Sequence, residues 1–516
     1  MNPPGFDVAR VRSPPQLRTS NLNGAVTDVR TVIHRATWSP AAGRLRRASS
    51  GRLLSRTVFV ALLAACSDEP SAPSGNAAEI IDASVVPGPH NVLSAVAHVR
   101  VRGADEVAVA YALDGATNGD SITPRVPVTG DSAVVPVLGL LPERRYVLRV
   151  VAYAGHRTST RDDLTFTTGS LPDDLPSYTA TGADASPGYV VMAAGLYGLV
   201  IDNTGRVVWY RRFPNGPGLN FAAQPNGRYA ARPAALDPAD PGHWVEIDAL
   251  GNETRVLPCS GGLRPRPHDL IAQPDGSYWL LCDETRLMDL TESGGVAGAV
   301  VTGTAVQHIA RDGTRLFHWS PFDHFAITDV DAGERTGAAV NWTHGNALDF
   351  DSDGNLIVSF RNLGEVTKID VATGNVIWRF GGRRNQFDLS SASGAAVASF
   401  VGQHSTRAYA PGAILLLDNI GDPDQSRAER YVLDEGARSA RLVQSYGSGP
   451  GVVTLIGGSV QALPDSRTLV SFGTAGRVEE YDASGRVVWR IDGHAGYVFR
   501  AQRILSLYAP GIGLTR

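Results

Sequence analysis

The chain has 516 residues, with 47 lysines and arginines against 51 aspartates and glutamates and a formal charge of −4 at pH 7. This length predicts several domains that can each bury a core of their own. Only one of the cationic residues is a lysine, Lys368, so the chain contains no Gly-Lys-Ser/Thr phosphate loop and no site that requires two lysines. Lys368 stands in a strand-like stretch and is a poor candidate for Schiff-base chemistry.

The basic residues are concentrated at the N-terminal end. The first 65 residues hold ten arginines and two aspartates, which leaves 37 basic and 49 acidic residues for the rest of the chain. Binding to nucleic acid needs clustered cations, so this acidic body argues against a nucleic-acid partner. The basic excess instead fits a targeting segment.

Residues 58–65 form a short apolar run that ends at Cys66, and Leu63-Ala64-Ala65-Cys66 resembles the bacterial lipobox. We therefore expect residues 1–65 to be an N-terminal extension with a lipoprotein signal peptide, Cys66 to be the acylated residue, and residues 66–80 to be a linker. The apolar run is too short to span a bilayer. This pattern predicts an exported protein, periplasmic or at the cell surface, with a lipid anchor as its only membrane contact.

Export would leave two cysteines in the body of the protein, Cys259 and Cys282. An oxidising compartment allows a disulfide between them, and two buried thiols are the alternative. No Cys-x-x-Cys motif is present, so the cysteines do not indicate a zinc site.

Residues 81–170 alternate apolar and polar side chains, with a turn signal roughly every ten residues. Leu140, Pro142 and Tyr146 have the spacing of a tyrosine corner. This segment therefore predicts a fibronectin type III-like β-sandwich. A proline-rich stretch at 171–180 separates it from the rest of the chain.

The region 180–516 is built from repeats. An acidic residue, a turn glycine and an apolar stretch recur six times, with successive glycines 46 to 62 residues apart, at 205, 251, 313, 374, 436 and 485. A second phrase, a strand, a tight turn and a strand, interleaves with the first. Two hairpins in each unit of about 55 residues give four strands per unit, so six units predict a six-bladed β-propeller. The predicted fold class is thus all-β, a propeller preceded by a sandwich.

Three copies of the second phrase place a histidine eight to ten residues before the turn glycine of the hairpin: His268, His344 and His404. We expect each histidine to start the innermost strand of its blade, where equivalent positions converge around the central channel. Arg361 ends the strand that follows His344 and should lie near it. Three imidazoles and a guanidinium can together donate hydrogen bonds to negatively charged oxygen atoms, so they suit an oxyanion ligand. Asp269 and Asn346, each near one of these histidines in sequence, could orient a ring nitrogen.

The sandwich, the propeller and the order His, His, Arg, His resemble the bacterial arylsulfate sulfotransferases, as do the phrases PHDL, THGNALDFD, SFRN and GQHS. These enzymes move a sulfuryl group from a phenolic sulfate ester to a phenolic acceptor without the nucleotide donor PAPS. The resemblance implies ping-pong transfer with His404 as the nucleophile that becomes a sulfohistidine. His268, His344 and Arg361 would bind the sulfuryl oxygens and the bridging oxygen. The resemblance implies no cofactor and no metal. It leaves open whether the protein forms a homodimer.

The residues themselves are suited to this chemistry. Sulfuryl transfer, like phosphoryl transfer, passes through a loose state with charge on three peripheral oxygens. A neutral imidazole is a competent nucleophile near pH 7, and His268 or His344 could donate a proton to the departing phenol.

Two other classes of function stay open. Ala372-Thr-Gly-Asn-Val-Ile-Trp378 resembles the docking motif of quinoprotein propellers, which include dehydrogenases and non-catalytic lipoproteins. Three histidines can also hold a zinc ion in a metal-dependent hydrolase.

Overall fold

The computed structural model describes residues 78–117, 120–235, 240, 242–422, 424–491 and 496–511. Within these ranges the protein is all-β, as predicted, with 3₁₀ turns as its short helices. Cys66 and the predicted signal peptide lie outside the described residues. No helix in the described ranges is long and apolar enough to cross a membrane.

The first two sheets enclose one core between them. One sheet has the order β1-β2-β6; the other has the order β4-β3-β7-β8, with β5 paired to β3. Inward-facing side chains alternate along β7, and Tyr146 on that strand accepts a hydrogen bond from the backbone N–H of Leu141 at 2.8 Å. The strands are β1 (Glu79–Pro87), β2 (Ser94–Arg102), β3 (Glu106–Leu113), β4 (Ser121–Ile122), β5 (Val126–Pro127), β6 (Ser132–Leu138), β7 (Arg145–Ala154) and β8 (Arg157–Thr167).

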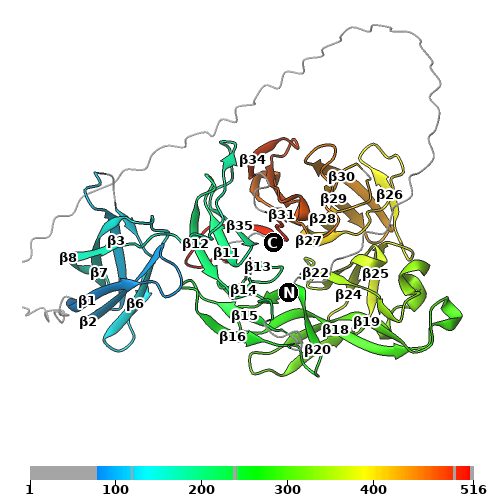
Figure 1. Ribbon diagram of the computed structural model, residues 1–516, viewed down its shortest axis with the longest axis horizontal. Coiled ribbons are helices and arrows are strands. Elements are labelled where there is room, and N and C mark those ends of the chain that lie inside the picture. The colour runs from blue at the N-terminus through cyan, green and yellow to red at the C-terminus, as the bar shows by residue number, and fades with distance from the viewer. Residues whose placement is uncertain are drawn as a thin grey trace, which may run out of the picture. The chain divides into compact units, whose positions relative to one another are not determined.

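Six further sheets follow, and each contains an antiparallel run of four strands. Counted from the strand that we call first, they are β35-β10-β11-β12, β13–β16, β17–β20, β22–β25, β27–β30 and β31–β34. Three strands are added to these sheets: β21 pairs with β19, β26 with β30 and β9 with β34. Figure 1 shows the sheets following one another in chain order.

The strands of these sheets are β9 (Ala180–Thr181), β10 (Tyr189–Ala194), β11 (Tyr197–Ile201), β12 (Val207–Arg212), β13 (Phe221–Ala223), β14 (Tyr229–Ala231), β15 (Trp244–Ile247), β16 (Glu253–Leu257), β17 (Arg264–Ala272), β18 (Tyr278–Met288), β19 (Ala299–Ile309), β20 (Arg315–Trp319), β21 (Ala339–Asn341), β22 (Gly345–Phe350), β23 (Leu356–Phe360), β24 (Glu365–Ile369), β25 (Val376–Gly381), β26 (Asp388–Ser391), β27 (His404–Ala410), β28 (Ala413–Asp418), β29 (Arg427–Asp434), β30 (Ser439–Gly447), β31 (Ser459–Ala462), β32 (Thr468–Ser471), β33 (Val478–Tyr481), β34 (Val487–Ile491) and β35 (Ala501–Ile504). The 3₁₀ turns are η1 (Thr291–Ser293), η2 (Pro321–Asp323), η3 (Ile327–Asp329), η4 (Ala332–Arg335), η5 (Arg361–Leu363), η6 (Pro464–Ser466) and η7 (Gly473–Ala475).

The repeated glycines occupy one structural position, the turn between the third and fourth strands of each sheet. Five of them have φ between +76° and +90°, a left-handed conformation that residues with a β-carbon rarely adopt. The exception is the turn with Gly436, where Arg438 takes the positive φ of 53°. At five of the six positions the repeated glycine is therefore explained by the left-handed backbone of the turn.

The first strands of the six sheets lie next to one another and are joined by side-chain hydrogen bonds. Their contacts run from β13 through β35, β31, β27 and β22 to β17. Polar side chains on one first strand bond to the backbone of the next at all six junctions, as with Asp269 Oδ2, which accepts from Leu348 N at 3.0 Å. The other pairs are Asn220–His268, Asp349–Ala408, Ser405–Val460, Gln461–Arg503 and Gln502–Ala223.

The two ends of the repeat region are exchanged between sheets. β35, near the C-terminal end, pairs with β10 and is the first strand of the sheet that opens the series (Figure 1). β9, at the start of the region, pairs with β34 of the last sheet. The series therefore closes on itself through strands from opposite ends of the region, a pairing that the repeat analysis did not predict.

The only lysine, Lys368, is a structural residue in β24. Its side chain is 2% exposed, and Nζ lies 2.7 Å from Asp351 Oδ2, 2.8 Å from Asp353 Oδ2 and 2.7 Å from Glu435 Oε1. Burial alone would lower the pKa of this amine, but hydrogen bonds to the three carboxylates outweigh it and raise the pKa above its usual value. Lys368 is thus a permanent cation, unsuited to nucleophilic chemistry.

Candidate active site

The three predicted histidines lie on three consecutive sheets, at or near the start of their first strands. His404 is the first residue of β27, and His344 directly precedes β22. The expectation that each histidine starts a strand is wrong for His268, because β17 begins at Arg264 and pairs with β18 before the histidine. Its register with β18 shifts between Pro265 and Leu270, and such a bulge turns side chains out of the ladder.

The backbone is strained where these side chains are presented. His344 has φ of 47° and Ser405, the residue after His404, has φ of 56°. Left-handed backbone at a residue with a β-carbon costs of order 1–3 kcal/mol and persists only where surrounding bonds impose it. At His344 one such bond is from the backbone N–H of Arg361 to the carbonyl oxygen of His344, at 3.0 Å.

The fold brings the three imidazoles close together, and two of them lie beside the buried phenyl ring of Phe499. The imidazoles of His268 and His344 have centroids 5.0 Å apart at an interplanar angle of 75°. Phe499, which directly precedes Arg500, lies with its ring 5.7 Å from that of His268 and 6.3 Å from that of His404. His268 and His404 are buried, and His344 is half-buried.

Hydrogen bonds fix the tautomer of His404. The Nδ2 of Asn419 donates to the carbonyl oxygens of Thr454 and Gly457, both at 2.9 Å, so its Oδ1 faces His404 Nδ1 at 2.9 Å. The carbonyl oxygen of Gly402 is 3.1 Å from the same ring nitrogen. Two acceptors place the proton on Nδ1, which leaves the lone pair on Nε2. The backbone N–H of Gly457 points at Nε2 from 3.4 Å.

His344 takes the opposite tautomer. The side-chain nitrogen Nδ2 of Asn341 lies 2.6 Å from His344 Nδ1 and donates to it. His344 therefore carries its proton on Nε2, available as a hydrogen-bond donor. His404 thus offers a lone pair and His344 an N–H.

All three imidazoles are neutral at pH 7. Burial first, and then the charges of Arg361 and Arg500, lower the pKa of His404 to about 4, against the hydrogen bonds to Asn419 and Gly402, which raise it. Burial, followed by the charges of Arg266 and Arg361, lowers the pKa of His344 to about 2. The pKa of His268 also lies well below its usual value, first because of burial and then because of Arg266.

Arg361 lies where the sequence predicts, next to His344 and close enough to act on both His344 and His404. Its Nη1 donates to Asn362 Oδ1 at 3.3 Å and its Nη2 to the carbonyl oxygen of Leu455 at 3.2 Å, while its buried Nε has no hydrogen-bond partner. Because these acceptors are uncharged, the guanidinium keeps its positive charge for an anionic ligand.

Sequence reasoning missed several residues of this site. Asn419 follows β28 as Arg361 follows β23, so aligning the ends of the second strands would have found it. Arg500 donates through Nη1 to Asp269 Oδ1 at 2.6 Å and through Nη2 to the carbonyl oxygen of Asn346 at 2.8 Å. Asp269 was expected to orient a ring nitrogen; its oxygens instead accept from Arg500, Arg407 and backbone N–H groups.

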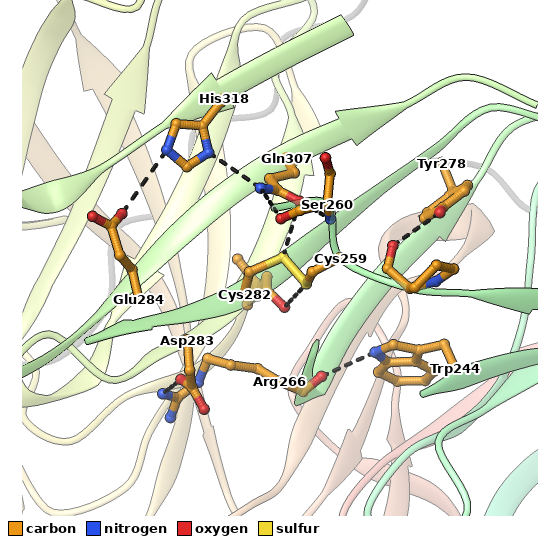
Figure 2. The surroundings of a disulfide bond; sticks show 12 residues. Trp244, Cys259, Ser260, Arg266, Tyr278, Cys282, Asp283, Glu284, Gln307 and His318 are labelled. Carbon is orange, nitrogen blue, oxygen red and sulfur yellow. Dashed lines mark hydrogen bonds and ion pairs between the residues drawn. A yellow bond between two sulfur atoms is a disulfide. The ribbon is translucent and has the colours of Figure 1, made fainter. Parts of the chain in front are cut away.

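The structure joins Cys259 and Cys282 in a disulfide, with Cα atoms 6.2 Å apart (Figure 2). Cys282 is on β18, which pairs with the strand that carries His268. The next residue on β18, Asp283, forms an ion pair with Arg266, which is 6% exposed and also acts on His268 and His344. The carbonyl oxygen of Arg266 accepts from Trp244 Nε1 at 2.9 Å. The disulfide therefore ties the connection between β16 and β17 to β18, next to the residue that pairs with Arg266.

A separate cavity of about 380 Å³ lies further along the first strands. It is lined by residues that follow the histidines in sequence, including Ile271, Asp349 and Tyr409, with the Asp269–Arg500 ion pair in its wall. Among the described residues, no group of three or more His, Cys, Asp or Glu side chains is arranged to hold a metal ion.

The fold and the site together define a class: an all-β protein in which three neutral imidazoles lie near Arg361, whose guanidinium has no carboxylate partner within the described residues. The chain belongs to the Arylsulfotransferase (ASST) family, whose profile matches residues 157–500. It is thus an aryl-sulfate sulfotransferase, a transferase that acts on phenolic substrates, as the sequence resemblance predicted.

No curated protein matches the chain. A solved protein of unknown function from Bacteroides caccae is similar with a TM-score of 0.40 and 14% identity, over 61% of this chain and 98% of that one. Virginiamycin B lyase from Staphylococcus aureus is similar with a TM-score of 0.34 and 10% identity, over 61% and 83% of the two chains. Regucalcin from Agrobacterium tumefaciens is similar with a TM-score of 0.30 and 15% identity, over 64% of this chain and 96% of that one. The family match alone carries the identification.

Removing the disulfide should destabilise the protein without changing its fold. Cys259 and Cys282 are 23 residues apart, and closing a loop of that size lowers the entropy of the unfolded chain by an amount worth about 3 kcal/mol. We expect the double variant Cys259→Ser/Cys282→Ser to unfold at lower urea concentration than the oxidised wild type. Reduction with dithiothreitol should shift the wild type to the same midpoint and leave the variant unchanged; equal midpoints before reduction would contradict the prediction.

Proposed function

We propose that this enzyme transfers sulfuryl groups by a ping-pong mechanism in which His404 becomes a sulfohistidine. The observation that carries the proposal is the tautomer of His404, whose Nε2 lone pair is held beside Arg361 by the bond from Nδ1–H to Asn419. A nucleophile must be unprotonated and held in place, and this imidazole is both. The donor is a phenolic sulfate ester and the acceptor a phenol.

In the proposed first step the lone pair of His404 Nε2 attacks sulfur while the bond from sulfur to the phenolic oxygen breaks. The electron pair of that bond leaves with the phenolate, and the N–H of His344, or of His268, donates to the departing oxygen. Arg361 neutralises the charge that gathers on the peripheral sulfuryl oxygens. The acceptor then reacts as its phenolate, after losing its proton to solvent water. Its oxygen attacks sulfur while the bond from sulfur to Nε2 breaks, and the electron pair of that bond returns to Nε2 of the free imidazole.

We also propose the finer architecture. The six sheets are the blades of a six-bladed propeller at 180–516, and the two sheets before them are a fibronectin type III-like sandwich at 81–170. The mutual contacts of the first strands and the exchange of β9 and β35 support the propeller. The bond from Leu141 N–H to the hydroxyl of Tyr146 supports the sandwich, because a tyrosine corner bonds back to the backbone in this way.

The transfer reaction depends on His404. With 4-nitrophenyl sulfate as donor, phenol should accelerate nitrophenol release in the presence of EDTA, and His404→Ala should reduce turnover by at least about a thousandfold. His156→Ala, at an exposed histidine of the sandwich, is the matched control and should retain full activity. Turnover lost in EDTA would favour the metal-dependent hydrolase, and wild-type inactivity with several aryl sulfates would favour a binding propeller.

The acid limb of the pH profile should lie unusually low. Because the pKa of His404 is about 4, we expect kcat/KM to stay level from about pH 8 to pH 5 and to fall once Nε2 is protonated. Asn419→Asp places a carboxylate beside Nδ1, which raises the pKa of His404 and should move the limb up by at least about one unit. Gln444→Glu, the same change of charge on β30, should leave the limb in place; a wild-type limb near pH 6.5 would overturn the assignment.

We propose that the protein is exported and anchored through an acylated Cys66. A disulfide in the body suits an oxidising compartment. The wild type should sediment with membranes after lysis, and Cys66→Ser should move to the soluble fraction, whereas Cys259→Ser/Cys282→Ser should remain with the membranes. Retention of Cys66→Ser in the membrane fraction would refute the anchor.

A further inference from the structure

Four large aliphatic side chains are exposed beside the sulfuryl site: Val401, Ile420, Leu455 and Ile456. Their exposed fractions are 46%, 38%, 62% and 51%. We call these four residues the aliphatic rim. Apolar side chains that cluster at the mouth of a polar site indicate a surface for an apolar ligand group.

The first half of the rim is attached to both Arg361 and His404. The backbone N–H of Ile420 donates to the carbonyl oxygen of Val401 at 3.1 Å, which joins the two segments. A β-carbon placed on Gly402 would lie 3.1 Å from Ile420 Cγ1 and 3.7 Å from Arg361 Nη2, so both groups flank this glycine. Gly402 is two residues before His404, and its carbonyl oxygen is bonded to that imidazole.

The second half of the rim is held by the site itself. The carbonyl oxygen of Leu455 accepts from Arg361 Nη2, and the carbonyl oxygens of Thr454 and Gly457 accept from Asn419. Leu455 and Ile456 therefore occupy fixed positions between two residues whose backbone contacts the catalytic machinery. Their side chains stay in solvent, although their backbone is tied to the site.

One aromatic ring extends this surface. A β-carbon placed on Gly457 would lie 2.5 Å from the hydroxyl oxygen of Tyr497 and 2.9 Å from Phe499 Cδ2. The half-buried ring of Tyr497 lies 6.1 Å from that of Phe499, which borders His268 and His404. A path of apolar groups thus leads from the histidines to the rim.

We propose that the aliphatic rim binds the aryl group of the substrate and selects sulfate esters of uncharged aryl groups with two or more fused rings over those of a single ring. The inference rests on the proposed function of His404. In-line attack by Nε2 requires the bond from sulfur to the phenolic oxygen to point away from the nucleophile, which carries the aryl group out of the buried site. A second fused ring lengthens the aryl group, so it contacts more of the rim and removes more of its apolar surface from water.

The test compares phenyl sulfate with 2-naphthyl sulfate as donors. Leu455→Ser and Ile456→Ser each remove apolar contact area, so kcat/KM for 2-naphthyl sulfate should fall roughly five- to tenfold and that for phenyl sulfate less than about twofold. Leu316→Ser is the matched control, since Leu316 on β20 is 57% exposed and distant in sequence from the rim. It should change neither value.

Three results would overturn the proposal. An equal fall for both donors would mean that the residues act through the geometry of the histidines. Unchanged kinetics would mean that the rim contacts no substrate. A shift from dimer to monomer in sedimentation by Leu455→Ser, with the donor preference unchanged, would assign the rim to a second copy of this chain.

Equilibrium binding separates this inference from the proposed function. If the wild type turned over no aryl sulfate, the proposed sulfohistidine mechanism would be wrong. Binding of an aryl group to the rim could still be measured. The fluorescence of 2-naphthyl sulfate should then report weaker binding to His404→Ala/Leu455→Ser than to His404→Ala. Equal binding to the two variants would overturn the proposal that the rim binds the aryl group.

Discussion

The position of every group in the site depends on hydrogen bonds between the first strands of neighbouring sheets. These strands belong to separate sheets in the described residues, so their facing backbone groups have no ladder to join. Buried N–H and C=O groups must nonetheless be paired, and here polar side chains such as Asp269, Asp349 and Ser405 accept from the next strand. The bonds occur at all six junctions, and they hold the strands that present the histidines in one fixed ring.

The same network sets the electrostatics of the site. Asp269 accepts from Leu348 N–H in the ring and also pairs with Arg500, while Asp283 pairs with Arg266. Two of the three guanidiniums near the imidazoles are thereby balanced by carboxylates, and Arg361 donates to uncharged acceptors. Since the histidines are neutral, Arg361 is the guanidinium of these three without a carboxylate partner in the described residues, and its charge suits the single negative charge of a sulfate ester.

The sequence predicted the repeats, the sheets and the residues that approach one another, because turn glycines and strand hairpins leave a local signal. It did not predict β35 as a first strand, since that strand pairs with a segment about 300 residues away and has no hairpin partner beside it. Arg500 was missed for the same reason. The tautomer of His404 depends on how two carbonyl oxygens orient the side-chain amide of Asn419. These contacts exist only in the folded structure and leave no spacing pattern in the sequence.

The neutrality of the histidines also explains why the substrate should be a phenol. Because the pKa of His344 is about 2, its Nε2–H acts as a hydrogen-bond donor to a departing oxygen and is not an acid able to protonate it fully at pH 7. A phenolate, whose conjugate acid has a pKa of about 10, leaves with that help, whereas an alkoxide, nearer to hydroxide in basicity, needs a complete proton transfer. In the proposed mechanism, the burial that keeps the nucleophile His404 unprotonated therefore also restricts the leaving group. The chemical selectivity for aryl over alkyl esters then arises at the imidazoles, and the choice among aryl groups is left to the surface around them.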